Sequence, residues 1–204
     1  MYFYKFRKKM KLLKKHKSFL AYFLLLLFPF IFFLPLSSGY IAMGNDFDQV
    51  YFAYKKYIFE FYQEGEFPFW SAPEGAGYSL VFNPFAQYFF PPSWILNFIL
   101  KIFDTFSLQI YLNYIFLLIS FSLIFQYQWL KSLKVATKEI CFLVAIITPC
   151  CLIFSNFLRF PNAILTIIWL PLLLLGVNYA LKKEKYLKSF LIIFFSSIFI
   201  FTAG

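Results

Sequence analysis

The chain has 204 residues, of which 62% are hydrophobic and 25% aromatic, and its formal net charge is +10. Soluble domains are close to half apolar, so this composition excludes a protein that covers one aqueous core with polar side chains. The charge does not indicate nucleic-acid binding, because the basic residues gather in short segments between hydrophobic runs. The sequence therefore predicts an all-α integral membrane protein that has membrane lipids, and no nucleic acid, among its partners.

Residues 1–17 carry eight basic residues and no acidic one. We expect this segment to be a cytoplasmic tail in contact with anionic headgroups. The apolar run 18–36 follows and predicts the first transmembrane helix, because roughly 20 apolar residues cross a bilayer. A signal peptide is the alternative. The run is long for the apolar region of such a peptide and contains Pro29 and Pro35, so we favour a retained anchor.

Residues 37–105 are predicted to be a long external loop. The part from Ser37 to Asp104 holds seven of the nine acidic residues and three of the nineteen basic ones. Apolar residues at helical spacing predict a short helix from Phe47 to Tyr62 that lies along the membrane surface, with Asp46 as its N-cap. From Gly65 onward, frequent Gly and Pro residues predict turns.

Further apolar runs predict four more spans, at 106–130, 140–157, 163–181 and 189–204, and Pro171 is expected to kink the fourth. With the tail inside, 15 of the 19 basic residues become cytoplasmic, as the positive-inside rule expects. The last run corresponds to about 24 Å of helix, which is less than the roughly 30 Å apolar core of a bilayer. We therefore expect the chain to be the N-terminal portion of a longer protein.

Asp46 and Asp48 are the first candidates for chemistry. In extended backbone, residues two apart point to the same side and can share a divalent cation. On a helix they lie roughly 200° apart and cannot. Asp46 alone could act as a general base, placed by a turn at Gly44. A plain helix N-cap is the alternative, and the metal requirement stays open.

Three other side chains are candidates for substrate binding. Glu64 and Trp70 bracket an aromatic turn, in which the indole can stack on a sugar or serve only as an interface anchor. Arg159 can bind a lipid phosphate with two hydrogen bonds, or only extend toward headgroups. Cys141, Cys150 and Cys151 match no metal motif and are expected to be small buried apolar residues.

The order of short motifs resembles the YfhO-like membrane proteins. These motifs are Gly44-Asn45-Asp46, the segment Glu64 to Trp70, Gly75-Ala76-Gly77, Tyr88 to Pro92, and Trp169-Leu170-Pro171-Leu172. The resemblance implies a GT-C membrane glycosyltransferase with many spans. It further implies a polyprenyl-phosphate-sugar donor, a cell-envelope glycan or lipid acceptor, and catalysis on the external face of a bacterial-type plasma membrane. Asp46 matches the catalytic base, with Asp48 in reserve.

Two alternatives stay open at this point. One is a non-catalytic membrane scaffold or lipid-handling subunit of an envelope complex. The other is a polysaccharide transporter or polymerase, although no charged residue lies between Phe106 and Leu130, where an ion path would usually need one.

Overall fold

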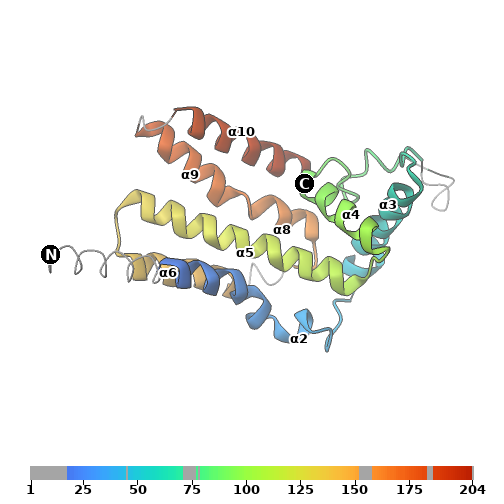
Figure 1. Ribbon diagram of the computed structural model, residues 1–204, viewed down its shortest axis with the longest axis horizontal. Coiled ribbons are helices and arrows are strands. Elements are labelled where there is room, and N and C mark those ends of the chain that lie inside the picture. Colours follow the sequence, from blue (N-terminus) through green and yellow to red (C-terminus); the bar gives the residue numbers. More distant parts are fainter. Residues whose placement is uncertain are drawn as a thin grey trace, which may run out of the picture.

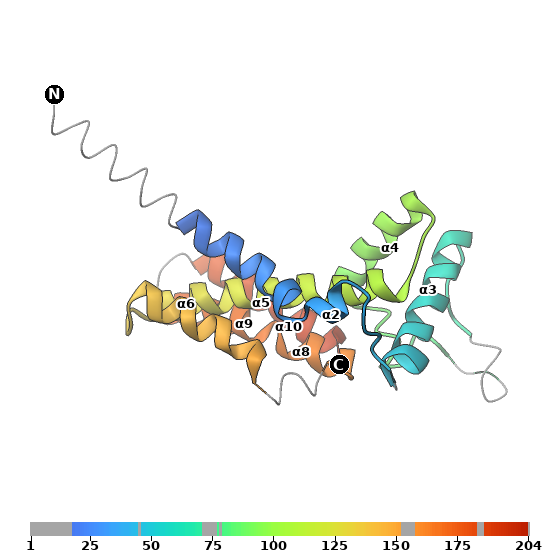
Figure 2. The same cartoon turned by 90° about the horizontal axis from the view of Figure 1, so that it is seen from below.

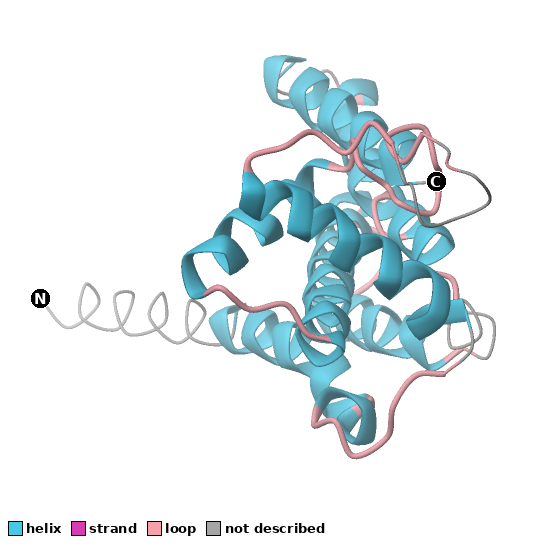
Figure 3. Cartoon of the chain, turned by 90° about the vertical axis from the view of Figure 1, so that its right-hand side faces the viewer, coloured by secondary structure: helices cyan, strands magenta, loops and turns pink. Residues whose placement is uncertain are grey.

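The computed structural model describes residues 18–44, 46–70, 77, 79–151, 158–182 and 186–203. Within these ranges every regular element is a helix (Figure 3). Three helices are long and apolar enough to cross a membrane: Leu108–Leu133, Pro161–Leu181 and Tyr186–Ala203. The predicted tail, 1–17, lies outside the described residues. The fold is therefore that of an all-helical membrane protein.

Helix α5, Leu108–Leu133, is the centre of the bundle (Figure 1). It begins where Ser107 Oγ accepts a 3.3 Å hydrogen bond from the Ile110 backbone, and it ends at Lys134, whose φ is +60°. The predicted span 106–130 thus agrees with a helix that extends three residues further. One side of α5 forms the main core with the fully buried Tyr111, Ile115 and Ile119.

The Ser18–Phe32 helix packs antiparallel along α5. The contact partners descend one helix as they ascend the other, in the pairs Tyr22–Tyr127, Leu26–Ser120, Phe30–Phe116 and Leu36–Gln109. The predicted continuous span 18–36 is interrupted at Phe33, where the one-turn helix α2, Leu34–Ser37, follows. Pro35 accounts for the break, because it lacks the N–H of the next helical bond and its ring clashes with the preceding turn.

The next predicted span, 140–157, differs from the structure. Helix α6, Lys138–Ile147, gives way to a 3₁₀ turn, Thr148–Cys150, and Cys151 is extended. Pro149 cannot donate a helical hydrogen bond, which explains why α6 stops here. Residues 152–157 lie outside the described part. Cys141 is buried as expected, whereas Cys150 and Cys151 are exposed.

Three apolar helices complete the described part of the bundle. The run 163–181 forms α8, Pro161–Ile167, and α9, Leu170–Leu181, with a turn between them just before Pro171, where a kink was predicted. Helix α10, Tyr186–Ala203, begins three residues before the predicted 189–204 and packs antiparallel to α9. Ser189 Oγ donates a 2.7 Å hydrogen bond to the Gly176 carbonyl between them.

The loop 37–105 contains two helices. A π-helical turn, Phe47–Phe52, leads into α3, Ala53–Glu64, which agrees with the predicted helix from Phe47 to Tyr62. The predicted cap does not form: Asp46 itself has helical dihedrals (φ −60°, ψ −25°), and its side chain makes no capping hydrogen bond. Helix α4, Pro91–Phe103, differs from the prediction that the Gly and Pro residues after Gly65 form turns. Proline is tolerated in the first turn of a helix, where its missing N–H costs nothing.

Helices α3 and α4 run parallel, side by side, beyond the N-terminal end of α5 (Figure 2). Three hydrogen bonds join them in the same order along both helices: Lys55 to Ser93, Lys101 to the Tyr62 carbonyl, and Gln63 to Asp104. We call this part of the molecule, where α5 and α8 also begin, the loop end. The opposite part, where α5 and α9 end at Lys134 and Lys182, is the lysine end.

Candidate functional site

A cavity of about 500 Å³ lies at the loop end. Three segments that are distant in the sequence line it, through Asp46, Val50, Tyr51, Phe85, Phe160, Asn162 and Ala163. Its volume lies within the range of small-ligand pockets, and its wall combines aromatic rings with a few polar groups, as such pockets do.

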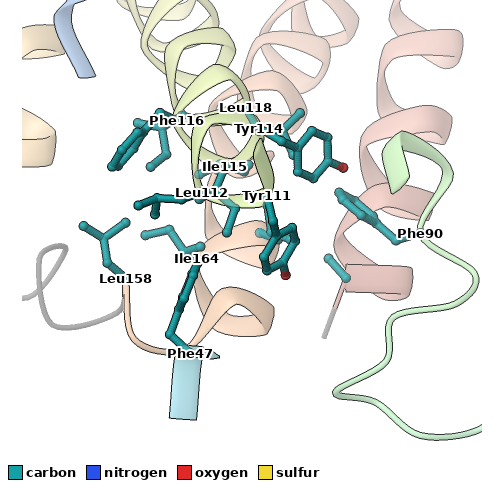
Figure 4. Close-up of a cluster of buried hydrophobic side chains, with 14 of the residues drawn as sticks. Phe47, Phe90, Tyr111, Leu112, Tyr114, Ile115, Phe116, Leu118, Leu158 and Ile164 are labelled. Atoms are coloured by element: carbon teal, nitrogen blue, oxygen red, sulfur yellow. The ribbon is translucent and has the colours of Figure 1, made fainter. Parts of the chain in front are cut away.

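Phe47 fixes the position of Asp46. The Phe47 ring is fully buried and stacks on Tyr111 at a centroid distance of 5.6 Å. Figure 4 shows this ring pointing from the start of its helix toward Leu112 and Ile164 in the core. Neighbouring residues on a helix are about 100° apart, so burial of Phe47 leaves Asp46 exposed at the cavity wall.

Tyr51 and Asn162 close one side of the cavity. The Tyr51 hydroxyl donates a 2.7 Å hydrogen bond to Asn162 Oδ1, and the Tyr51 ring meets Phe85 edge-on at 5.5 Å. The pKa of Tyr51 is raised, first by burial and then by the negative charge of Asp46. Asp46 and Tyr51 both line the cavity. The cavity therefore holds a carboxylate beside a hydrogen-bonded phenol–amide pair.

Asp48 does not join Asp46 at the cavity. The backbone is helical from residue 46, so the condition for a cation shared by the two carboxylates is not met. Asp48 Oδ1 is instead buried, and no hydrogen-bond partner occurs for it within the described ranges. Among the residues that the structure covers, no group of three His, Cys, Asp or Glu side chains could hold a metal ion.

The structure brings the segment of Arg159 to the Asp46 cavity. Arg159 is exposed and directly precedes Phe160, which lines the wall, but Arg159 is not itself a lining residue. Arg159 is therefore next to a lining residue in sequence, and its role as a phosphate ligand stays a prediction.

Glu64 and Trp70 lie elsewhere. Glu64 is the last residue of α3, eighteen positions after Asp46, which corresponds to about 25 Å along a helix. The exposed Trp70 covers Gly77, where a Cβ atom would collide with the indole. Neither residue lines the cavity, so the described residues do not form a single cleft from Asp46, Glu64 and Trp70.

Lys55 is a polar feature that the sequence analysis missed. It is only 5% exposed between α3 and α4, and its Nζ donates to Ser93 Oγ at 3.2 Å and to the Gln87 carbonyl at 3.4 Å. Both acceptors are neutral, and burial lowers the pKa of Lys55 to about 7. A signal was available: Phe47, Tyr51 and Lys55 share one helical face, so an apolar stripe contains a lysine.

Comparisons of the chain with protein-family models, curated proteins and solved structures find no significant match. The function is therefore argued from the loop-end cavity and its residues.

Proposed function

We propose that this chain is part of a membrane glycosyltransferase of the GT-C type, similar to the YfhO-like proteins. It transfers a sugar from a polyprenyl-phosphate donor to a cell-envelope glycan or lipid. The proposal includes five spans, a cytoplasmic N-terminus and an external loop end in a bacterial-type plasma membrane. The separation of charge along the bundle supports this orientation, because Lys131, Lys134 and Lys182 all lie at the lysine end.

The observation that carries the proposal is the exposed Asp46 carboxylate at the wall of the loop-end cavity. A general base has to be within hydrogen-bond reach of the proton that it removes, which requires an accessible carboxylate beside space for a substrate. Phe85 and Phe160 supply apolar ring surface in the same cavity. This combination suits an acceptor that presents a hydroxyl group on a partly apolar body.

The reaction assigns one step to each group. Asp46 accepts the proton of the acceptor hydroxyl, and the acceptor oxygen forms a bond to the anomeric carbon of the donor sugar. The bond between that carbon and the lipid phosphate breaks on the opposite side, so the phosphate leaves with the electron pair and the configuration inverts. Arg159, next to the cavity segment, stabilises the phosphate charge through paired hydrogen bonds.

The test is sugar transfer from a labelled polyprenyl-phosphate sugar in proteoliposomes. Asp46→Asn keeps the shape of the side chain and removes the base, so transfer should fall by about 10²- to 10⁴-fold. Asp104→Asn is the matched control, because Asp104 is also a loop carboxylate but hydrogen bonds to Gln63 away from the cavity. Unchanged transfer by Asp46→Asn at equal protein levels would remove Asp46 from this role.

Topology gives an independent test. Ser79→Cys, in a background with Cys141, Cys150 and Cys151 replaced by alanine, should react with a membrane-impermeant thiol reagent added outside intact cells. Labelling only after the membrane is permeabilised would place the loop end in the cytosol, where the proposed geometry of donor and base fails.

A scaffold or lipid-handling function is the second candidate, and the surface of α4 favours it. Its outer face is apolar and exposed over Trp94, Ile95, Phe98, Ile99, Ile102 and Phe103. A scaffold would tolerate Asp46→Asn and would lose complex formation when Ile95 and Phe98 are changed to serine. A glycosyltransferase shows the opposite sensitivity to Asp46→Asn.

A further inference from the structure

A second cavity, of about 400 Å³, lies at the lysine end. The Ser18–Phe32 helix and the last turns of α5 and α9 line it, through Tyr22, Gln128, Lys131, Ser132, Lys134, Tyr179 and Lys182. Figure 1 shows these ends of α5 and α9 at the same end of the bundle. The described residues of the lining include three lysines and no carboxylate, so this part of the cavity is a concave, basic surface at the ends of apolar helices.

Two of the lysines are held in place by neighbouring groups. Lys131 Nζ lies 4.6 Å from the ring centroid of Tyr127 and 5.7 Å from that of Tyr22. Lys182 donates a hydrogen bond to the Ser132 carbonyl at the end of α5. An ammonium group has three donors, so Lys182 can bind a further acceptor while it keeps this bond. Among the described residues of the lining, these two cations are therefore positioned by a ring and a carbonyl rather than by a carboxylate.

Lys134 occupies a strained position. Its φ of +60° places it in the left-handed region at the C-terminal end of α5, where glycine or asparagine is usual. A side chain with a Cβ atom costs about 1–2 kcal/mol there. A lysine in place of glycine adds a charge to the cavity wall at the expense of stability.

The charge balance of the cavity is positive. The C-terminal ends of α5 and α9 each contribute roughly −0.5 of an elementary charge, against three ammonium groups. The described lining is therefore positive, which suits a phosphate group. A cavity of about 400 Å³ has room for a lipid headgroup.

The surroundings favour a lipid as the source of this phosphate. On the Ser18–Phe32 helix, which contributes Tyr22 to the cavity, Phe19 and Phe23 are exposed (69% and 46%). At the other wall Leu181, next to Lys182, is 78% exposed. Acyl chains need such apolar surface directly beside the headgroup, and tyrosine rings such as Tyr22 and Tyr179 are typical of headgroup depth. A soluble phosphate would need neither feature.

We propose that the lysine-end cavity binds the phosphate headgroup of an anionic phospholipid. Lys131, Lys134 and Lys182 contact the phosphate, and the acyl chains extend along the apolar surface of the Ser18–Phe32 helix. The proposal is independent of the glycosyltransferase proposal, because the site lies at the opposite end of the bundle and shares no residue with the Asp46 cavity.

The experiment measures phosphatidylglycerol binding to the full chain in detergent by native mass spectrometry, with phosphatidylcholine as the neutral competitor. The wild type should bind phosphatidylglycerol saturably and at least 10-fold more tightly than phosphatidylcholine. In the double variant Lys134→Gln/Lys182→Gln, the ratio of the affinity for phosphatidylglycerol to that for phosphatidylcholine should fall at least 10-fold. Lys56→Gln/Lys101→Gln removes two charges at the loop end and should keep it. Equal losses by both double variants would mean general charge attraction and would overturn the site.

Two further arms separate the remaining explanations. Lys134→Gly removes a cation and relieves the strained φ, so it should unfold no more easily than the wild type and still bind phosphatidylglycerol more weakly. Unchanged lipid binding by folded Lys134→Gly would exclude Lys134 from the site. Inorganic phosphate at millimolar concentration should compete only weakly. If inorganic phosphate stabilises the chain against unfolding and phosphatidylglycerol does not, the cavity binds a soluble anion. That result would overturn the lipid proposal.

Discussion

The Tyr51 hydroxyl donates a 2.7 Å hydrogen bond to Asn162 Oδ1 and so joins two residues that are 111 positions apart. The bond ties the first-loop helix to the beginning of α8, on either side of the cavity that Asp46 lines. It therefore sets the distance between Asp46 and the segment that follows Arg159. A change at either partner should alter both the stability of the loop end and the shape of the cavity.

A double-mutant cycle on this pair measures the tie directly. Tyr51→Phe and Asn162→Ala should each destabilise the chain, and their effects should fail to add by about 1 kcal/mol, the usual net contribution of one hydrogen bond. The measurement is unfolding in mixed detergent micelles. Tyr40→Phe is the control, because Tyr40 is 87% exposed and its hydroxyl should contribute nothing measurable. Strictly additive effects would show that the bond does not join the two segments.

The long helices could be predicted because length and apolar composition alone identify them. Helix α4 could not be predicted, because its pattern of polar and apolar residues is the reverse of that in a water-soluble helix. Ser93 and Asn97 are buried, whereas Trp94, Ile95 and Phe98 are exposed. A pattern of polar residues inside and apolar residues outside indicates that the outer face meets lipid or a partner instead of water. The double proline at its start added a misleading turn signal.

The candidate site was predictable only in part. The alternation of spans places the first loop and the 158–162 loop on one side of the bundle, which allows Asp46 to meet that segment. Glu64 and Trp70 are close to Asp46 in sequence, yet a rigid helix carries them away from it. A count of loop charges does not reveal the burial of Lys55, because it does not show which way a side chain points.

The buried Lys55 predicts an unusual pH dependence of stability. Its pKa is about 7 in the folded chain against 10.5 for an ordinary lysine. Between these values the unfolded chain binds more protons, so the free energy of unfolding should rise with pH, by up to about 1.4 kcal/mol per pH unit. The loss of stability from burying the Lys55 ammonium group is fully present below pH 7. It is absent above the pKa that Lys55 has in the unfolded chain. Chemical unfolding at pH 7, 8 and 9 measures the slope.

Two variants test whether Lys55 causes this rise of the free energy of unfolding with pH. Lys55→Met should remove it, because methionine has no charge to lose. Lys56→Met should retain it, because Lys56 is an exposed residue in an i,i+4 pair with Glu60 at 3.9 Å. A slope that survives in Lys55→Met would mean that another group titrates between pH 7 and 9 and that Lys55 keeps its ordinary pKa.

Alanine substitutions at two glycines of the loop distinguish the cost of backbone strain from the cost of a side-chain collision. Gly65 and Gly77 both have positive φ (+77° and +93°), but a Cβ atom meets nothing within 4 Å at Gly65, whereas at Gly77 it meets the Trp70 indole. Gly65→Ala should cost about 1 kcal/mol from strain alone. Gly77→Ala should cost more and should also displace Trp70, which tryptophan fluorescence in a variant lacking Trp94, Trp129 and Trp169 would report. An unchanged Trp70 spectrum would contradict the packing.

Gly176 allows the closest approach of α9 and α10. A Cβ atom there would lie 2.8 Å from Ile192 Cγ2, 2.9 Å from Ile193 Cγ1 and 3.2 Å from the Ile193 backbone nitrogen. Alanine is the better helix former by about 1 kcal/mol, but overpacking costs about 1–3 kcal/mol. The side chains can rotate away and the backbone nitrogen cannot, so overpacking should prevail and Gly176→Ala should destabilise the chain.

The measurement is the SDS fraction at which helices α9 and α10 separate. A pair of fluorophores, one on each helix, reports the separation. Small residues at helix contacts are what allow close packing in a membrane, where no hydrophobic effect drives the helices together. Gly176→Ala/Ile192→Ala should recover part of the loss, because it removes the nearest atom that the new Cβ meets. Gly44→Ala is the control, since no atom lies within 4 Å of that Cβ and its φ is not in the left-handed region. Greater resistance to SDS in Gly176→Ala would show that helix propensity prevails and that α9 and α10 are not packed at their closest distance here.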